Sequence, residues 1–204
     1  MDGISCLLTI STKGSISLFT RGDGRRGRDI SYLKYYVNFS QIPEQKLALK
    51  PGTAIRGELV IQKASELAQK ERQTIAGIAN QKTLDPQIFK TLKVDFVPYH
   101  VFEVGNIAQE LQMLDKSNFN RVQARVVDVS ENLLTALLRE FREKSLYKLD
   151  GLVVHSLEKY RDAEQKYPDY AFKFKVEGAK AKSRVTHIKW KISKNGLVIP
   201  TIYF

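Results

Sequence analysis

Glycine and arginine are concentrated between Thr20 and Gly27, where the sequence reads Thr-Arg-Gly-Asp-Gly-Arg-Arg-Gly. Glycine lets a backbone turn tightly and approach a ligand closely, and the planar guanidinium group of arginine matches the geometry of phosphate. This composition indicates either a loop that contacts phosphate or nucleotide, or a solvated hairpin loop. Taken alone, the segment leaves both interpretations open.

Acidic residues also stand next to glycine in the pairs Asp2-Gly3, Gly57-Glu58 and Asp150-Gly151. An ionised carboxylate accepts hydrogen bonds, so at a sheet edge it can bind the hydroxyl groups of a ribose. It can equally be a surface charge. The third pair opens the apolar run Leu-Val-Val, which is typical of a buried strand. The three pairs are therefore candidates for a ligand site.

A second basic feature is the sequence Ala-Phe-Lys-Phe-Lys at residues 171–175. Because strand side chains alternate between faces, we expect Phe172 and Phe174 to face the core. Lys173 and Lys175 then share the opposite face, where they are either solvated or directed at phosphates. The lysine-rich stretch that follows favours phosphate.

Histidine and cysteine are too few and too scattered to predict a structural zinc site, which needs four such ligands close together. His100, His155 and His187 are each expected to be packing or surface residues. The single cysteine, Cys6, lies in an apolar run and is predicted to be a small core residue in a reducing compartment.

Charge is the feature of the overall composition that bears most on partners. Lysine and arginine number 33 against 22 acidic residues, which leaves a net charge of +11 and a pI near 9.6. This balance favours a polyanion, with nucleic acid the foremost candidate, because each neutralised phosphate releases bound counterions. The sequence lacks the pattern of a signal peptide and an apolar run of membrane-spanning length. It therefore predicts a soluble, intracellular protein.

Apolar periodicity predicts the elements that position these residues. Two strands joined at Lys13-Gly14 are expected within residues 4–19, and further strands at 54–61, 94–102, 121–129, 152–154 and 171–174, the last two short and buried. Helices are expected at 64–72, at 107–114 and after the N-cap Ser130, with an apolar stripe over 133–141. Residues 185–204 are predicted to form a hairpin about Asn195-Gly196.

These elements indicate an α+β fold of antiparallel sheets with flanking helices. The composition becomes polar and lysine-rich after Val176, so we place residues 1–177 in one domain and residues 178–204 at the start of a second, β-type domain. So short a segment cannot close a barrel, and we expect the chain to stop inside this second domain.

In their order and rough spacing, the motifs resemble the nucleotidyltransferase (adenylation) domain of NAD-dependent DNA ligases, an ATP-grasp-like ligase fold. The matching motifs are Asp-Gly, Thr-Arg-Gly-Asp-Gly, Arg-Gly-Glu, a tyrosine-containing strand, Asp-Gly-Leu-Val-Val and Ala-Phe-Lys-Phe-Lys. Residues 186–203 are similar to the opening strands of the OB-fold β-barrel that follows in that family. The variant Arg-Gln-Thr-Ile-Ala-Gly at residues 72–77 resembles viral or phage members.

The resemblance implies an enzyme of DNA replication and repair that seals nicks through lysyl-AMP and DNA-adenylate intermediates. NAD would be the AMP donor, Mg²⁺ would assist, and a monomer would act on nicked duplex DNA. An alternative is an inactive module of the same fold that binds nucleotide or DNA. ATP-dependent ligases and RNA-capping enzymes share the Lys-x-Asp-Gly motif but fit residues 20–24 and 171–174 less well.

Site roles follow from the resemblance, position by position. The catalytic positions are Asp2, Glu58, Arg142, Asp150 and Lys173, and the nucleotide-binding positions are Gly3, Arg21, Glu58, Tyr99, His155 and Lys173. Glu58 would hold the ribose and Tyr99 would stack on adenine. Asp150 matches a metal-associated acid and Lys173 a phosphate-binding lysine. His155 stands where the family has a lysine, and a mostly neutral imidazole would weaken the contact with AMP.

The resemblance also assigns residues to DNA and to the nucleophile. Contacts with DNA are expected for Arg72, Lys82, Lys175, Lys189 and Lys191. The nucleophilic lysine of the family stands two residues before the aspartate of the Asp2-Gly3 motif, a position that precedes Met1. We therefore expect a chain that is truncated at its N-terminus, lacks the module for the nicotinamide mononucleotide half of NAD, and does not form lysyl-AMP by itself.

Overall fold

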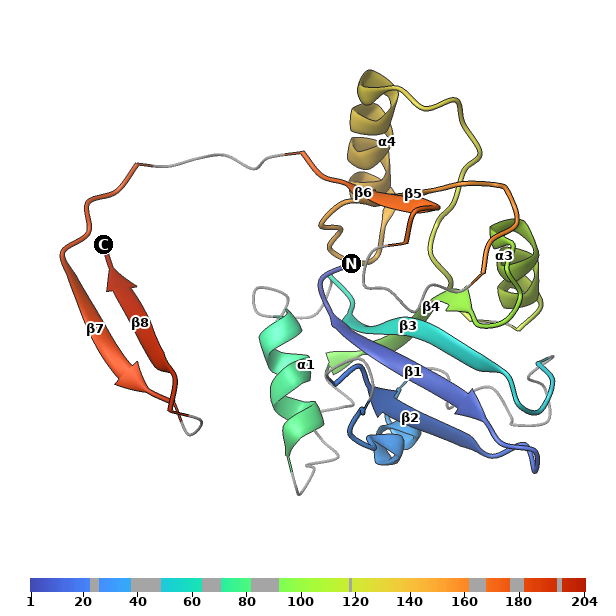
Figure 1. Cartoon of the computed structure of the whole chain (residues 1–204), viewed down its shortest axis with the longest axis horizontal. Coiled ribbons are helices and arrows are strands. Elements are labelled where there is room, and N and C mark those ends of the chain that lie inside the picture. The colour runs from blue at the N-terminus through green and yellow to red at the C-terminus, as the bar shows by residue number, and fades with distance from the viewer. Residues whose placement is uncertain are drawn as a thin grey trace.

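The computed structural model describes residues 1–22, 26–37, 49–63, 71–81, 92–117, 119–161, 168–176, 182–193 and 196–204. These residues form one four-stranded and two two-stranded antiparallel sheets with helices alongside (Figure 1). The predicted α+β fold of antiparallel sheets and flanking helices is confirmed at this level.

The largest sheet has the strand order β2 (Ile16–Thr20), β1 (Ile4–Ile10), β3 (Ala54–Ile61) and β4 (Val94–Val101). β1 and β2 form the predicted hairpin, and β3 has the predicted bounds. Alternate side chains of these strands, such as Leu8 and Ile55, are fully buried, and each contributes about 1.5–3 kcal/mol. Cys6 is buried as predicted, which raises the pKa of its thiol to about 12. The other face carries Ser5 and Glu58, which lie opposite each other in the register.

The described helices are η1 (Ser31–Tyr35, a 3-10 helix), α1 (Glu71–Asn80), α3 (Ile107–Lys116) and α4 (Glu131–Lys144). Ser130 caps α4 as predicted, because its side chain accepts a hydrogen bond from the backbone N–H of Leu133. In the stripe of α4, Leu134, Leu137 and Leu138 are buried, whereas Leu133 is exposed.

The predicted helix at residues 64–72 differs from the structure. Residues 64–70 lie outside the described part of the chain, and the described helix α1 runs on to Asn80, where no helix was expected. Ile75, Ile78 and Ala79 have helical spacing and are buried in the main core. This short apolar face holds α1 against the sheet.

The predicted strand at residues 121–129 is wrong, because this segment belongs to none of the described sheets. Of its apolar side chains, Val122 packs against the small core cluster of Val60, Val97 and Tyr147, whereas Val126 and Val129 are exposed. Ion pairs hold the segment instead: Arg121 binds Asp115 of α3, and Arg125 binds Glu140 of α4 with N–O distances of 3.0 and 3.1 Å. A β-branched composition favours an extended backbone but does not ensure a neighbouring strand.

β5 (Leu152–His155) and β6 (Ala171–Phe174) confirm two predicted strands, which pair with each other. The prediction that these strands and Phe172 are buried is wrong, since Val153 is 70% and Phe172 52% exposed. A two-stranded sheet has two broad faces, and the described elements do not cover these side chains. The apolar composition of these two segments predicted strands correctly, but it did not show that the side chains are buried.

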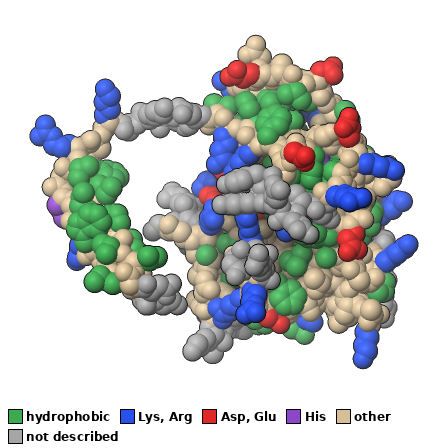
Figure 2. All heavy atoms as spheres, in the orientation of Figure 1, with side chains coloured by type: hydrophobic (Ala, Val, Ile, Leu, Met, Phe, Trp, Pro, Cys, Tyr) green, Lys and Arg blue, Asp and Glu red, His purple; other side chains and the backbone are tan. Residues whose placement is uncertain are grey.

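β7 (His187–Ile192) and β8 (Val198–Tyr203) form the predicted C-terminal hairpin, which is set apart from the rest of the molecule (Figure 1). Gly196 in its turn has a φ of +76°, whereas Asn195 lies outside the described residues. Every side chain of both strands is exposed. Hydrophobic side chains gather on this hairpin in Figure 2.

Candidate active site

A cleft of about 1410 Å³ lies between the four-stranded sheet and the β5–β6 pair. Its lining comes from β1, β3, β4, the loop after β2, the β5–β6 pair, the helices α1, α3 and α4, and the segment between α3 and α4. Nine of the predicted site residues line it: Asp2, Gly3, Arg21, Glu58, Arg72, Tyr99, Asp150, His155 and Lys173. Residues that are up to 171 positions apart in the sequence therefore share one surface.

The pairing of β3 with β4 directs Tyr99 into this cleft. Arg56 lies opposite His100 and Gly57 opposite Pro98, so Tyr99 is the extra residue of a β-bulge. A bulge changes the direction of a side chain within a sheet. The Tyr99 hydroxyl lies 3.1 Å from Ser5 Oγ on the neighbouring part of β1. The register thus brings Ser5, Glu58 and Tyr99 together on the cleft side of the sheet.

Glu58 is a largely desolvated carboxylate on this cleft. Burial raises its pKa, and the positive charges of Arg72 and Lys173 oppose that effect. Burial also raises the pKa of the Tyr99 phenol. A desolvated carboxylate beside an aromatic ring can accept hydrogen bonds from ligand hydroxyls while the ring packs on a flat, apolar group.

The loop after β2 approaches the cleft through a tight turn. Gly22 has a φ of +55°, and a Cβ atom there would lie 1.8 Å from the carbonyl oxygen of Arg26, so the turn requires glycine. The backbone N–H of Arg21 donates to the carbonyl of Ser5 at 3.3 Å. This anchors the loop to β1 and leaves the Arg21 side chain on the cleft wall.

Asp150 carries two lysine contacts at the start of β5. Lys175 Nζ lies 2.5 Å and Lys173 Nζ 3.2 Å from the same carboxylate oxygen, Oδ2. The hydrogen bond from Lys175, followed by that from Lys173, lowers the pKa of Asp150. Lys173 of β6 and Lys175 directly after it therefore both lie beside an acid, and Lys173 also lines the cleft.

Lys175→Met is expected to raise the pKa of the Asp150 carboxyl more than Lys173→Met does, because the contact of Lys175 is shorter. Carboxyl ¹³C NMR titration of both variants measures the difference. Lys182→Met, on the exposed connection before β7, controls for the loss of one positive charge. Equal titration of Asp150 in all three variants would contradict this account.

Arg142 is separate from the cleft lining. Its guanidinium donates from Nε to the carbonyl of Leu149 at 3.1 Å and from Nη2 to the carbonyl of Asp150 at 3.3 Å. The backbone carbonyl of Arg142 in turn accepts a hydrogen bond from Lys63 Nζ at 2.6 Å. Arg142 therefore acts on the backbone that leads into β5.

The predicted DNA-contacting residues are dispersed. Arg72 lines the cleft, and Lys175 lies beside Asp150. Lys189 and Lys191 lie on β7, apart from the cleft, and Lys82 lies outside the described residues.

Sequence reasoning missed Ser5, Arg56 and His100, all of which line the cleft. Ser5 had a signal, because a polar residue beside Cys6 in an apolar strand marks the face turned away from the core. His100 was expected to be a packing or surface residue. The bulge that brings it to the cleft next to Tyr99 depends on pairing between distant strands, which local composition does not report.

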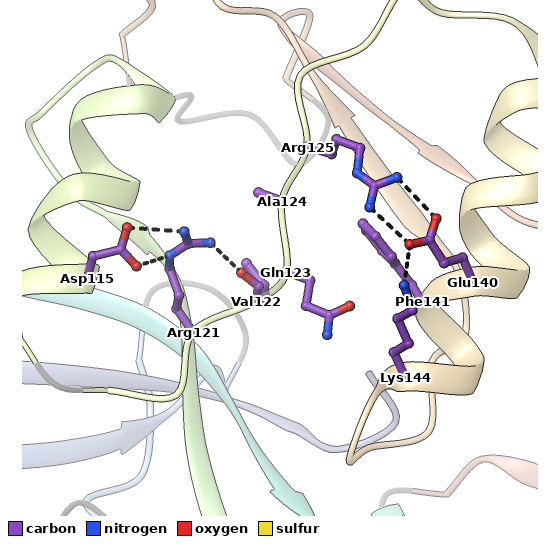
Figure 3. Close-up of a pocket in the computed structure, with 9 residues that line it drawn as sticks. All are labelled: Asp115, Arg121, Val122, Gln123, Ala124, Arg125, Glu140, Phe141 and Lys144. Carbon is purple, nitrogen blue, oxygen red and sulfur yellow. Dashed lines mark hydrogen bonds and ion pairs between the residues drawn. The ribbon is translucent and has the colours of Figure 1, made fainter.

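A second cavity, of about 410 Å³, lies between α3, residues 121–125 and α4 (Figure 3). Its basic side chains are already paired with acids. Arg125, and after it Lys144, lowers the pKa of Glu140 to about 2, and Arg121 lowers the pKa of Asp115. Lys173 of the larger cleft is paired with Asp150 in the same way, so the larger cleft is the better candidate for a phosphate ligand because it gathers the predicted nucleotide-binding residues.

Comparison with known proteins shows the family of this chain. Residues 1–179 match the NAD-dependent DNA ligase adenylation domain, which covers most of the chain. The chain belongs to this family. Its relatives include a protein named DNA ligase from Acanthamoeba polyphaga mimivirus, 31% identical over the whole chain, and one of the same name from Bacillus subtilis, 25% identical over 98% of the chain. The chain spans about a third of the length of each of these ligases.

Within the described ranges, no group of three or more His, Cys, Asp or Glu side chains is arranged to hold a metal ion. None of the helices in those ranges is long and apolar enough to cross a bilayer.

Proposed function

We propose that this adenylation domain serves an enzyme that seals nicks in duplex DNA with NAD as the AMP donor. One observation carries the proposal: the residues that the family motifs assign to nucleotide all line a single cleft. One of them, Glu58, is a desolvated carboxylate. The names of the viral and bacterial relatives, both DNA ligase, support the same activity.

In the proposed complex, the adenine of AMP packs on Tyr99 and the ribose hydroxyls donate to Glu58. Arg21 and Lys173, which line the same cleft, bind the phosphate. His155 lies on this wall, at a position where the family has a lysine. Arg142 orients the backbone before β5 through its bonds to two carbonyls.

The chemistry proposed for the enzyme has three steps. The amine of the family's lysine attacks the α-phosphate of NAD, forming a P–N bond as the P–O bond to nicotinamide mononucleotide breaks. An oxygen of the 5′-phosphate at the nick then attacks the phosphorus of lysyl-AMP, and the P–N bond to the lysine breaks, which leaves AMP attached to the DNA. Finally the 3′-hydroxyl attacks that phosphate, AMP leaves, and a phosphodiester is formed. Cationic side chains in the cleft stabilise the negative charge that develops at phosphorus.

Mg²⁺ fits the acids of this cleft. The ion commonly uses one or two carboxylates together with phosphates and water, and Asp2 and Asp150 both line the cleft. These two residues would hold it when a nucleotide is bound. The ion would supply charge neutralisation at the phosphates.

We also propose that residues 1–177 form the adenylation domain and that residues 178–204 begin an OB-fold. The alternation in β7 and β8 supports this, since Ile188, Trp190 and Ile192 share one face and are exposed. Lys189 and Lys191 share the opposite face, where they would contact DNA phosphates.

To test the proposal, the protein encoded by the complete reading frame that contains these 204 residues is expressed. It is then assayed with nicked duplex DNA, Mg²⁺ and either NAD or ATP. Sealing with NAD alone supports the proposal, and sealing with ATP alone would reject NAD as the donor. Binding of AMP or DNA without sealing would identify an inactive module. Glu143→Gln, an exposed carboxylate of α4, is the control for Glu58→Gln in this assay.

A further inference from the structure

Glu110 is a buried carboxylate that no ligase motif explains. Its side chain has no exposed surface, although it belongs to α3, a helix on the protein surface. The carboxylate accepts hydrogen bonds from His100 Nδ1 at 2.9 Å and from the backbone N–H of Val101 at 2.8 Å. These bonds attach Glu110 to the end of β4, next to the bulge that carries Tyr99.

The other oxygen of Glu110 accepts a hydrogen bond from the hydroxyl of Tyr160. Tyr160 belongs to the segment that follows β5, and its ring stacks on Tyr170 with a centroid distance of 4.0 Å. His155 lies against both rings, at 4.9 and 5.0 Å. A continuous set of contacts thus runs from Glu110 to His155 on the cleft wall.

The same segment is also attached to the two residues that directly precede α3. The backbone N–H of Tyr160 donates to the carbonyl of Gly105 at 2.9 Å, and Asn106 Nδ2 donates to the carbonyl of Leu157 at 3.3 Å. In Figure 1, α3 stands beside the end of β4 and the segment that leaves β5. At this end of the cleft, the four-stranded sheet and the β5–β6 pair are therefore joined through α3.

We propose that Glu110 is a positioning residue that sets the width of the nucleotide cleft, by holding His100 on one wall and, through Tyr160, His155 on the other. The inference rests on the proposed binding of AMP in this cleft. A carboxylate that accepts three hydrogen bonds has few alternative orientations, and buried networks of this kind fix geometry. With the Tyr160 bond removed, the β5–β6 wall should move more freely and hold AMP less well.

Tyr160→Phe tests the proposal because it removes the hydroxyl and keeps the ring that stacks on Tyr170. The matched control is Tyr32→Phe, whose hydroxyl donates to the carbonyl of Ala79 at 3.1 Å, away from Glu110. Calorimetric titration with AMP should give a dissociation constant about 2- to 10-fold larger for Tyr160→Phe than for the wild type, and an unchanged value for Tyr32→Phe. Hydrogen exchange of the β5 and β6 amides should be faster in Tyr160→Phe only.

Two outcomes separate this inference from the proposed function. Wild-type protein that does not bind AMP would contradict the proposed function, and faster exchange in β5 and β6 of Tyr160→Phe would still support the role of Glu110 in holding the wall. A Tyr160→Phe variant that matches Tyr32→Phe in both AMP affinity and exchange would overturn the inference, even if both variants melt below the wild type.

Discussion

Glu58→Gln is expected to weaken binding of AMP about 10- to 100-fold at pH 7.5 and to raise the melting temperature of the protein. Hydrogen bonds to charged groups are worth about 1.5–3 kcal/mol, and the substitution removes the charge from the group proposed to hold the ribose. The same substitution should stabilise the folded protein because Glu58 is desolvated. Burial raises the pKa of Glu58, which means that the folded protein disfavours the ionised carboxylate.

The pH dependence of this variant follows from the raised pKa of Glu58. A carboxyl whose pKa is raised by folding stabilises the folded protein below its ordinary pKa of 4.5. This stabilisation is lost as the pH rises through the pKa of the carboxyl in the folded protein. The melting temperatures of wild type and Glu58→Gln should therefore converge at low pH and separate above the folded pKa. AMP affinity of the wild type should fall as pH drops through that pKa, whereas that of Glu58→Gln should not respond to this titration.

Calorimetry with AMP and thermal melts between pH 4 and pH 8 measure both effects. Glu143→Gln, which changes an exposed glutamate in α4, should alter neither quantity. A Glu58→Gln variant with wild-type affinity at pH 7.5 would remove Glu58 from the nucleotide site.

Gly3→Ala is expected to destabilise the protein by about 1–3 kcal/mol and to abolish detectable AMP binding. A Cβ atom on Gly3 would lie 2.1 Å from the carbonyl oxygen of Leu59, 2.7 Å from Val60 Cγ1 and 2.9 Å from Glu58 Cγ. The first of these contacts is with backbone, which cannot rotate away as a side chain can. The start of β1 must therefore separate from β3, which displaces Asp2 and Glu58 together.

Gly77→Ala is the matched control for Gly3→Ala. A Cβ atom on Gly77 meets no atom within 4 Å, and the residue lies inside α1. Alanine there should stabilise the protein by about 0.5–1 kcal/mol and leave AMP affinity unchanged. Urea denaturation measures both stabilities. If Gly3→Ala proves as stable as wild type and binds AMP equally well, the close packing of β1 against β3 does not shape the site.

Local sequence was sufficient for most strands and for the helices whose pattern was strong. β3 was predictable because alternation of apolar and polar residues indicates a half-buried strand. The cap of α4 was predictable because a serine before an apolar stripe indicates the start of a helix. The segment at residues 121–129 shows the limit of this reasoning. Its β-branched residues favour an extended backbone, but a strand also needs a neighbour, and none of the described strands supplies one.

The ordered motifs of this chain were enough by themselves to determine its family, because each keeps a chemically constrained residue beside a glycine or within a short strand. Tertiary structure alone decided how those motifs form a site. The β3–β4 register creates the bulge that turns Tyr99 into the cleft, and Glu110 meets Tyr160 across 50 residues of chain. Such contacts arise from pairing and packing between distant segments, whereas sequence periodicity reports only which face of each element is buried.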